Sequence, residues 1–162
     1  MAREIFDVAI KSSNVESAFA AVFAAVGADK DVDVKAGVGV TGYCMGGHVA
    51  VKVAGLFGDR ITAAASFHGG FLASDAPESP HLLAPKMKAR VYVAAASDDP
   101  SFPEAMKERL TDAFVDAKVE FVVETYPARH GWCVPDSPSF HEAEASKAQK
   151  KLTSLLRETL KR

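Results

Sequence analysis

The sequence predicts an α/β fold, in which a parallel sheet of about four strands carries helices on both faces. Short segments rich in valine, isoleucine and alanine alternate with longer segments of helical character. The four apolar segments are residues 37–41, 61–67, 89–96 and 119–125. Strands that are apolar throughout and alternate with helices are typical of a parallel sheet that is buried on both faces. Such sheets bind ligands beyond the carboxyl ends of their strands, so the residues that follow each strand are the functional candidates.

Length, composition and charge limit the kinds of protein that this chain can be. The chain has 162 residues, which suits one domain with its own core, and 48% of them are apolar. A formal net charge of −2 gives no sign of nucleic acid or an anionic membrane as a partner. The first seven residues contain no apolar signal-peptide core, and no apolar run reaches membrane-spanning length. We therefore expect a single cytoplasmic domain over residues 1–162, without membrane or nucleic-acid partners.

The cysteines exclude two kinds of site. There are two, Cys44 and Cys133, and they form no C-x-x-C pair. Neither a disulfide framework nor a zinc site is indicated, so we expect no metal and no cofactor. Two free thiols agree with a reducing compartment.

The helices are predicted from apolar spacing and from their ends. Residues 1–12 show no clear pattern. Apolar residues at helical spacing predict a helix from about Asn14, with Ser13 or Asn14 as its cap and Gly27 as its end. Residues 72–88 are rich in proline and predict a long loop with one helical turn. Three further helices are expected at residues 49–56, from Pro103–Glu104 to about residue 117, and at residues 140–160.

The first strand leads into a turn with the layout of a nucleophile elbow. The segment reads Gly42-Tyr43-Cys44-Met45-Gly46-Gly47 and is followed by a helical run. This is the pattern G-x-S-x-G with a cysteine in place of the serine. Glycines two residues away on either side let the strand and the helix pack closely, and the helix N-terminus favours a thiolate and later an oxyanion. The alternative interpretation is a glycine-rich turn with a structural cysteine.

Candidates for a base and an acid follow two later strands. Asp98 and Asp99 come after residues 89–96, and His130 comes after residues 119–125. A thiol nucleophile needs a base that accepts its proton and a carboxylate that orients the base. The order nucleophile, acid, histidine is the order found on an α/β-hydrolase sheet. Another histidine, His68, also follows a strand, where a pocket-lining and a structural role are both open.

Three motifs together resemble the dienelactone hydrolase family, a cysteine-nucleophile branch of the α/β-hydrolases that acts on esters and lactones. They are residues 42–47 (GYCMGG), 99–103 (DPSFP) and 126–132 (YPARHGW). The resemblance implies that Cys44 is the nucleophile, His130 the base and the backbone N–H of Met45 an oxyanion donor. In the family the acid stands four residues before a proline that opens the next helix. This spacing favours Asp99 over Asp98.

Departures from the family pattern narrow the expected substrate. The family has several strands before the elbow helix that this chain lacks, so we expect a truncated, reduced α/β-hydrolase fold. In the family that region supplies the second oxyanion N–H, a glutamate near the thiol and an arginine for substrate. A further carboxylate-binding arginine would stand where this chain has Val134. The resemblance therefore implies small neutral esters in place of carboxylated dienelactones, with His68 and Trp132 as pocket walls.

These inferences predict a carboxylic ester hydrolase that uses a Cys-His-Asp triad and an acyl-enzyme thioester. One alternative is a catalytically weak remnant of the fold that serves as a binding or subunit-interaction module, and another is a thiol redox sensor. Without earlier strands, residues 37–41 would form a sheet edge, which proteins cover or use for pairing. We expect either a homodimer that covers this edge or residues 1–12 folded across it.

Overall fold

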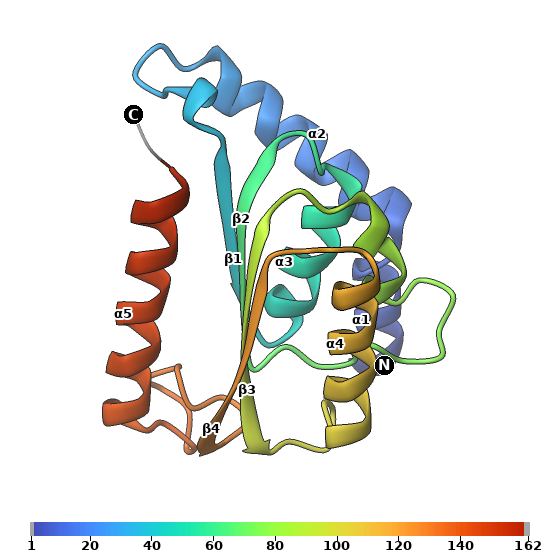
Figure 1. The fold of residues 1–162 in the computed structure, drawn as a ribbon, viewed down its shortest axis with the longest axis vertical. Coiled ribbons are helices and arrows are strands. Elements are labelled where there is room, and N and C mark those ends of the chain that lie inside the picture. The colour runs from blue at the N-terminus through green and yellow to red at the C-terminus, as the bar shows by residue number, and fades with distance from the viewer. Residues whose placement is uncertain (1, 161–162) are drawn as a thin grey trace.

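A four-stranded parallel sheet with the strand order β1-β2-β3-β4 forms the centre of the computed structural model, which describes residues 2–160 (Figure 1). Each observed strand overlaps a segment that the sequence predicted, so the predicted α/β fold is confirmed. The strands are β1 (Val38–Tyr43), β2 (Ile61–Phe67), β3 (Arg90–Asp98) and β4 (Phe121–Arg129).

Helices cover both faces of the sheet, as predicted. One face is covered by α5 (Glu142–Thr159), and the other carries the remaining α-helices (Figure 1). No helix within residues 2–160 is both long and apolar enough to cross a membrane. The helices of the second face are α1 (Ala2–Ala9), α2 (Ser12–Ala28), α3 (Met45–Leu56) and α4 (Glu104–Asp116), with short 3-10 helices at Val34–Ala36 and Pro80–Lys86.

Alternation along the strands builds two hydrophobic cores. In β3, Val91 and Val93 belong to the core beneath α2, α3 and α4, whereas Tyr92 and Ala94 belong to the core beneath α5. Successive side chains of a strand point to opposite faces of the sheet. Because both faces are covered, residues of both sets must be apolar. This explains why the strands read as continuous apolar segments in the sequence.

The start and end of α2 differ from the prediction. The helix begins at Ser12 after Lys11, whose side chain makes no capping hydrogen bond, so the predicted cap at Ser13 or Asn14 is wrong. The Asn14 side chain instead donates to the carbonyl of Val8 at 2.7 Å, which secures the connection between α1 and α2. Gly27 lies within the helix, which continues to Ala28.

The strand that leads to Cys44 lies at an edge of the sheet, as expected. In the described part of the chain β1 pairs only with β2. The first helix does not cover this edge: α1 lies on the face of the sheet that carries α3 (Figure 1), and the ring of Phe6 lies 5.5 Å from the ring of His48 on α3. The expectation that residues 1–12 fold across the β1 edge is therefore wrong for residues 2–12, because α1 is drawn to the apolar surface of α3.

A buried lysine ties the first two helices to the rest of the fold. The side chain of Lys52 on α3 is 0% exposed, and its Nζ donates to the carbonyl of Ile10 and, at 2.8 Å, to Oε2 of Glu78. The same Oε2 accepts from the backbone N–H and the hydroxyl of Ser12 at 2.6 and 2.7 Å. The hydrogen bond from Lys52, followed by those from Ser12, lowers the pKa of Glu78 to about 2.

Candidate active site

Cys44 lies in the turn between β1 and α3, in a conformation that side-chain-bearing residues rarely adopt. Its φ is 54° and its ψ is −121°, and its side chain is exposed. A Cβ atom at Gly42 would lie 2.0 Å from the carbonyl oxygen of Gly46, and one at Gly47 would lie 2.7 Å from Oγ of Ser66. The absence of side chains at Gly42 and Gly47 therefore lets the strand and the helix approach closely enough to form this turn.

A continuous line of contacts joins Cys44 to His130 and Asp99. Sγ of Cys44 lies 3.0 Å from Nε2 of His130, and Nδ1 of His130 lies 2.7 Å from Oδ2 of Asp99. The other oxygen of Asp99 accepts hydrogen bonds from the backbone N–H and the hydroxyl of Ser101, at 2.9 and 2.6 Å. The structure thus brings together the three side chains that the sequence singled out from the ends of β1, β3 and β4.

The geometry also distinguishes the two neighbouring aspartates. The side chain of Asp99 is 2% exposed and faces His130, whereas that of Asp98 is 64% exposed and pairs with Arg129 at 3.0 Å. Asp98 is the last residue of β3, while Asp99 lies beyond the strand. The choice of Asp99 from the proline spacing therefore agrees with its position in the structure.

Electrostatics favour a charged histidine at this site. The hydrogen bond to Asp99 is the main cause that raises the pKa of His130 to about 9; burial opposes it and the Cys44 contact adds to it. Burial alone would raise the pKa of Asp99, but hydrogen bonds from His130 and Ser101 outweigh it and the pKa is lowered. The raised pKa favours the charged form of His130 at neutral pH, and its Nε2 lies 3.0 Å from the Cys44 sulfur.

His68 lies beneath the elbow. Its φ is 40°, it is buried, and its Nδ1 accepts the backbone N–H of Cys44 at 3.1 Å, a donor shared with the carbonyl of Phe67. Because a backbone N–H can only donate, the neutral ring carries its proton on Nε2. Burial, helped by the charge on His130, lowers the pKa of His68 to about 4. The ring therefore supports the backbone of Cys44, and its burial disagrees with the predicted role as a pocket wall.

Trp132 is likewise not an exposed wall. The residue is 0% exposed and its ring stacks on that of Tyr126 with 4.4 Å between centroids, within the core beneath α5. A ring without exposed surface cannot contact a ligand in this conformation. Its predicted place in the pocket is therefore wrong for this structure, because the side chain packs into the second core.

Sequence reasoning missed two supporting contacts. One is the pair of hydrogen bonds from Ser101 to Asp99; the residues D-P-S match the turn in which an aspartate side chain binds the backbone two positions on, so this contact had a recognisable signal. The other is the contact of His68 with the Cys44 backbone. It follows from the register of β1 and β2, which sets Tyr43 opposite Phe67, and no local pattern reveals it.

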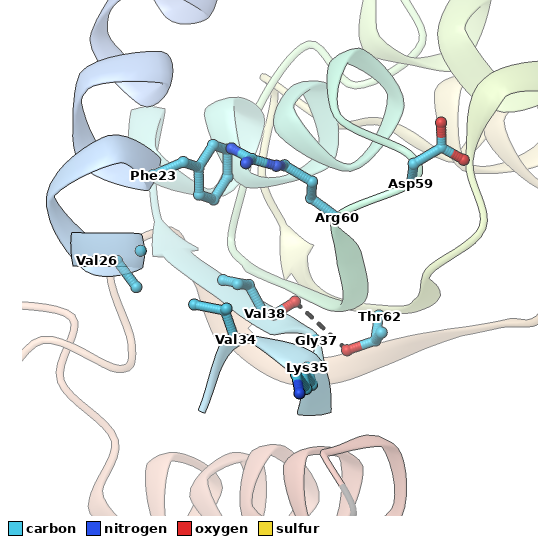
Figure 2. A pocket seen from close by; sticks show the side chains of 10 residues that line it. Phe23, Val26, Val34, Lys35, Gly37, Val38, Asp59, Arg60 and Thr62 are labelled. Carbon is cyan, nitrogen blue, oxygen red and sulfur yellow. Dashed lines mark hydrogen bonds between the residues drawn. The ribbon is translucent and has the colours of Figure 1, made fainter. Parts of the chain in front are cut away.

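One well-formed cavity lies away from these residues. It has a volume of about 300 Å³ and is lined by Phe23, Lys35, Val38 and Arg60, among others (Figure 2). The guanidinium of Arg60 lies over the Phe23 ring, 5.3 Å from its centroid. These residues surround the amino ends of β1 and β2, whereas Cys44 follows the carboxyl end of β1. The cavity in Figure 2 is therefore not the binding site for a substrate of this thiol.

Comparison with models of protein families gives a match to the dienelactone hydrolase family over residues 2–160. The chain belongs to the dienelactone hydrolase family. Comparison with the curated proteins found no match. The family assignment and the parallel sheet together identify the fold as that of the α/β-hydrolases.

Solved structures agree with the fold of the dienelactone hydrolase family. A dienelactone hydrolase-like promiscuous phosphotriesterase from metagenomic libraries is 24% identical, with a TM-score of 0.76 over 91% of this chain and 62% of that one. A puromycin-hydrolyzing peptidase of Mycobacterium tuberculosis is 22% identical, with a TM-score of 0.68 over 90% and 25% of the two chains. The acylaminoacyl peptidase of Pyrococcus horikoshii is 15% identical, with a TM-score of 0.69 over 91% and 28%.

The coverage of these dienelactone hydrolase-like structures is partial. A structure of the dienelactone hydrolase type from Klebsiella pneumoniae is matched over 50% of its own length and the promiscuous phosphotriesterase over 62%, so this chain spans less than two thirds of each. The family is one of hydrolases, and the proteins of these solved structures are described as hydrolases too.

Proposed function

We propose that this protein is a cofactor-independent carboxylic ester hydrolase that acts on small neutral esters. The observation that carries the proposal is the line of contacts from the Cys44 sulfur through His130 to the buried carboxylate of Asp99. A nucleophile, a base within hydrogen-bonding distance and a group that orients the base are the parts that acyl transfer requires. The free thiols Cys44 and Cys133 suit a cytoplasmic setting, which we include in the proposal.

The reaction proceeds through a thioester. The thiolate of Cys44 attacks the acyl carbon, and the carbonyl oxygen becomes an oxyanion that accepts the backbone N–H of Met45. As the first residue of α3, Met45 has no preceding helical carbonyl to bind this N–H. The intermediate collapses, the C–O bond breaks, and His130 gives its proton to the leaving alcohol. His130 then takes a proton from water, whose oxygen attacks the thioester, releasing the acid and the thiolate.

Two features support neutral substrates. The position four residues after His130 is Val134, where the family's carboxylate-binding arginine would stand. The arginine next to the base, Arg129, is already paired with Asp98 at 3.0 Å. No free cation on this segment is therefore directed to a substrate carboxylate.

The test is hydrolysis of p-nitrophenyl acetate by wild type and Cys44→Ala. We expect kcat/KM to fall by on the order of 10³-fold or more, because the nucleophile is removed. Cys133→Ala is the matched control for loss of a thiol, and it loses far less activity because it removes no member of the triad. Rapid quenching of the wild type yields an acetyl group on the peptide that contains Cys44. Equal rates in wild type and Cys44→Ala overturn the proposal.

A second candidate function is subunit interaction through the β1 edge. Val38–Tyr43 contains no charged residue and no proline, the usual devices that keep an edge strand from pairing. We propose a homodimer in which two β1 strands pair across this edge. Light scattering at micromolar concentration gives a dimer, and Thr41→Pro, which removes a backbone donor from β1, gives a monomer. A wild-type monomer contradicts this proposal and leaves the hydrolase proposal unaffected.

A further inference from the structure

A cavity of about 350 Å³ lies beside the candidate active site, on the face of the sheet that α5 covers. Its walls include Tyr43, Phe67, Cys133, Phe140 and Ala145. Three of these residues neighbour the site in the chain: Tyr43 precedes Cys44, Phe67 precedes His68, and Cys133 comes three residues after His130. Consecutive Cα atoms are about 3.8 Å apart, so the Cα of Cys44 lies about that far from the Cα of Tyr43, a residue that lines the cavity.

The position of this cavity follows from the way successive side chains of β1 point to opposite faces of the sheet. Gly39 faces Leu156 of α5. Because side chains alternate along a strand, Thr41 and Tyr43 lie on the same face of β1 as Gly39. The ring of Tyr43 stacks on Phe67 at 5.0 Å between centroids, and Phe67 belongs to the core beneath α5. The chain then turns at Cys44. The thiol therefore stands at the end of the strand while the cavity opens along its α5 side.

We propose that this cavity receives the acyl side chain of the ester, and that the preferred substrates carry an uncharged aromatic or branched apolar acyl group. This inference rests on the proposed hydrolase function. It names the substrate class within the broader set of neutral esters.

The lining of the cavity sets the chemical class. Its lining includes buried Phe67 and the partly exposed rings of Tyr43 and Phe140, which are surfaces that an apolar group can cover. Burial raises the pKa of Cys133 to about 12, so this thiol stays neutral. Glu142 is the charged residue among those that line the cavity, Ser146 and Gln149 are its uncharged polar residues, and no lysine or arginine of the described chain is among them. A substrate with an anionic acyl group is therefore disfavoured by repulsion.

The size of the cavity excludes acetate as the best substrate. A volume of about 350 Å³ falls in the lower part of the range for small-molecule sites and leaves most of the space unfilled by a methyl group. A phenyl or branched aliphatic group fills far more of it. One additional methylene in a hydrophobic pocket changes discrimination about 10- to 200-fold, so we expect phenylacetyl esters to exceed acetyl esters about 10- to 100-fold in kcat/KM.

The experiment compares p-nitrophenyl acetate and p-nitrophenyl phenylacetate in wild type, Ala145→Phe and Ala143→Phe. Ala145 lines the cavity, while Ala143 lies on the exposed surface of the same helix and does not line it, so the two variants introduce the same ring into α5 in different places. In Ala145→Phe the ratio of kcat/KM for the phenylacetate to kcat/KM for the acetate falls at least about 10-fold, whereas Ala143→Phe keeps the wild-type ratio. A preference that persists in Ala145→Phe, or is absent from the wild type, overturns the inference.

Alkylation of Cys44 separates this inference from the proposed reaction. Rates for iodoacetamide and N-benzyl iodoacetamide are measured by peptide mapping in the same three proteins. If no ester is hydrolysed but the benzyl reagent is favoured in wild type and loses that advantage in Ala145→Phe, the cavity assignment holds and the hydrolase proposal fails. If esters are hydrolysed without any acyl preference, the hydrolase proposal holds and the cavity assignment fails.

Discussion

Nδ1 of His130 lies 2.7 Å from Oδ2 of Asp99, although 31 positions separate the two residues in the chain. They meet because β3 and β4 are parallel neighbours, whose carboxyl ends reach the same edge of the sheet. Asp99 is nearly buried and held by Ser101, so its carboxylate is fixed in place before any substrate arrives. The neighbouring carboxylate of Asp98 lies at the surface and has a different partner.

Asp99→Asn is expected to lower kcat for ester hydrolysis by about 10²- to 10⁴-fold. The amide cannot stabilise the imidazolium of His130, and it supports the wrong tautomer of the neutral ring. Asp98→Asn is the matched control and keeps most of the activity, because Asp98 pairs with Arg129 and not with His130. Steady-state kinetics with p-nitrophenyl acetate provide the measurement. Equal losses in the two variants contradict the assignment of Asp99.

The rate of hydrolysis is expected to fall at alkaline pH. The hydrogen bond to Asp99 raises the pKa of His130 from 6.5 to about 9, so the proton needed by the leaving alcohol is lost as the pH rises through about 9. The same shift stabilises the folded state fully below pH 6.5, and this contribution is lost as pH rises from 6.5 through about 9. A pH profile of kcat/KM measures the alkaline limb, and Asp99→Asn moves it to lower pH. A limb that Asp99→Asn leaves in place contradicts this account.

Two glycines of the elbow are expected to differ in their tolerance of a side chain. A Cβ atom at Gly42 would lie 2.0 Å from the carbonyl oxygen of Gly46, and the backbone there cannot yield without opening the turn. Gly42→Ala should therefore lower the free energy of unfolding by about 1–3 kcal/mol or more. Gly46→Ala has open space and should be neutral or stabilising by up to about 1 kcal/mol. Urea denaturation measures both; similar effects would argue against this steric account of the elbow.

Glu78→Gln is expected to destabilise the fold by about 1.5 kcal/mol at neutral pH, the lower end for a charged hydrogen bond, because Glu78 is partly exposed. The variant leaves the buried ammonium of Lys52 without its counter-charge. The lowered pKa of Glu78 stabilises the folded state above pH 4.5, and this contribution is lost as the pH falls through about 2. The difference between wild type and variant should therefore shrink in acid, as urea denaturation at several pH values can show.

The control for this experiment is Asp59→Asn. Asp59 also pairs with a lysine, Lys88, but both side chains are largely exposed. An exposed pair contributes little to stability, so no measurable change is expected. Equal effects of the Glu78 and Asp59 substitutions would show that the burial of Lys52 does not matter.

The strands could be predicted because they lie between two cores, so that most of their residues are apolar. The candidate site could be predicted because Cys44, Asp99 and His130 each follow a strand, and parallel strands bring such residues to one edge. The contact of His68 with the Cys44 backbone was not predictable, because it depends on the register between β1 and β2. The burial of Trp132 was missed for a related reason: packing against Tyr126 decides it, and the sequence shows only an aromatic residue after a histidine.

The first helix was not predicted, since Ala2–Ala9 spans only 8 residues, too few for a helical period to stand out. Its position depends on distant partners, among them Lys52, whose burial no local pattern indicates. Local patterns therefore identified the elements that alternate along the sheet, and missed the contacts that join distant segments.

The contact between Cys44 and His130 joins residues 86 positions apart, at the two outer strands of the sheet. Contacts of such long sequence separation form late, because the chain between them must first be ordered. Until β4 docks beside β3, Cys44 has neither the imidazole of His130 nor the carboxylate of Asp99 behind it. A chain still being synthesised or partly unfolded therefore lacks the candidate site, which exists only once all four strands are in place.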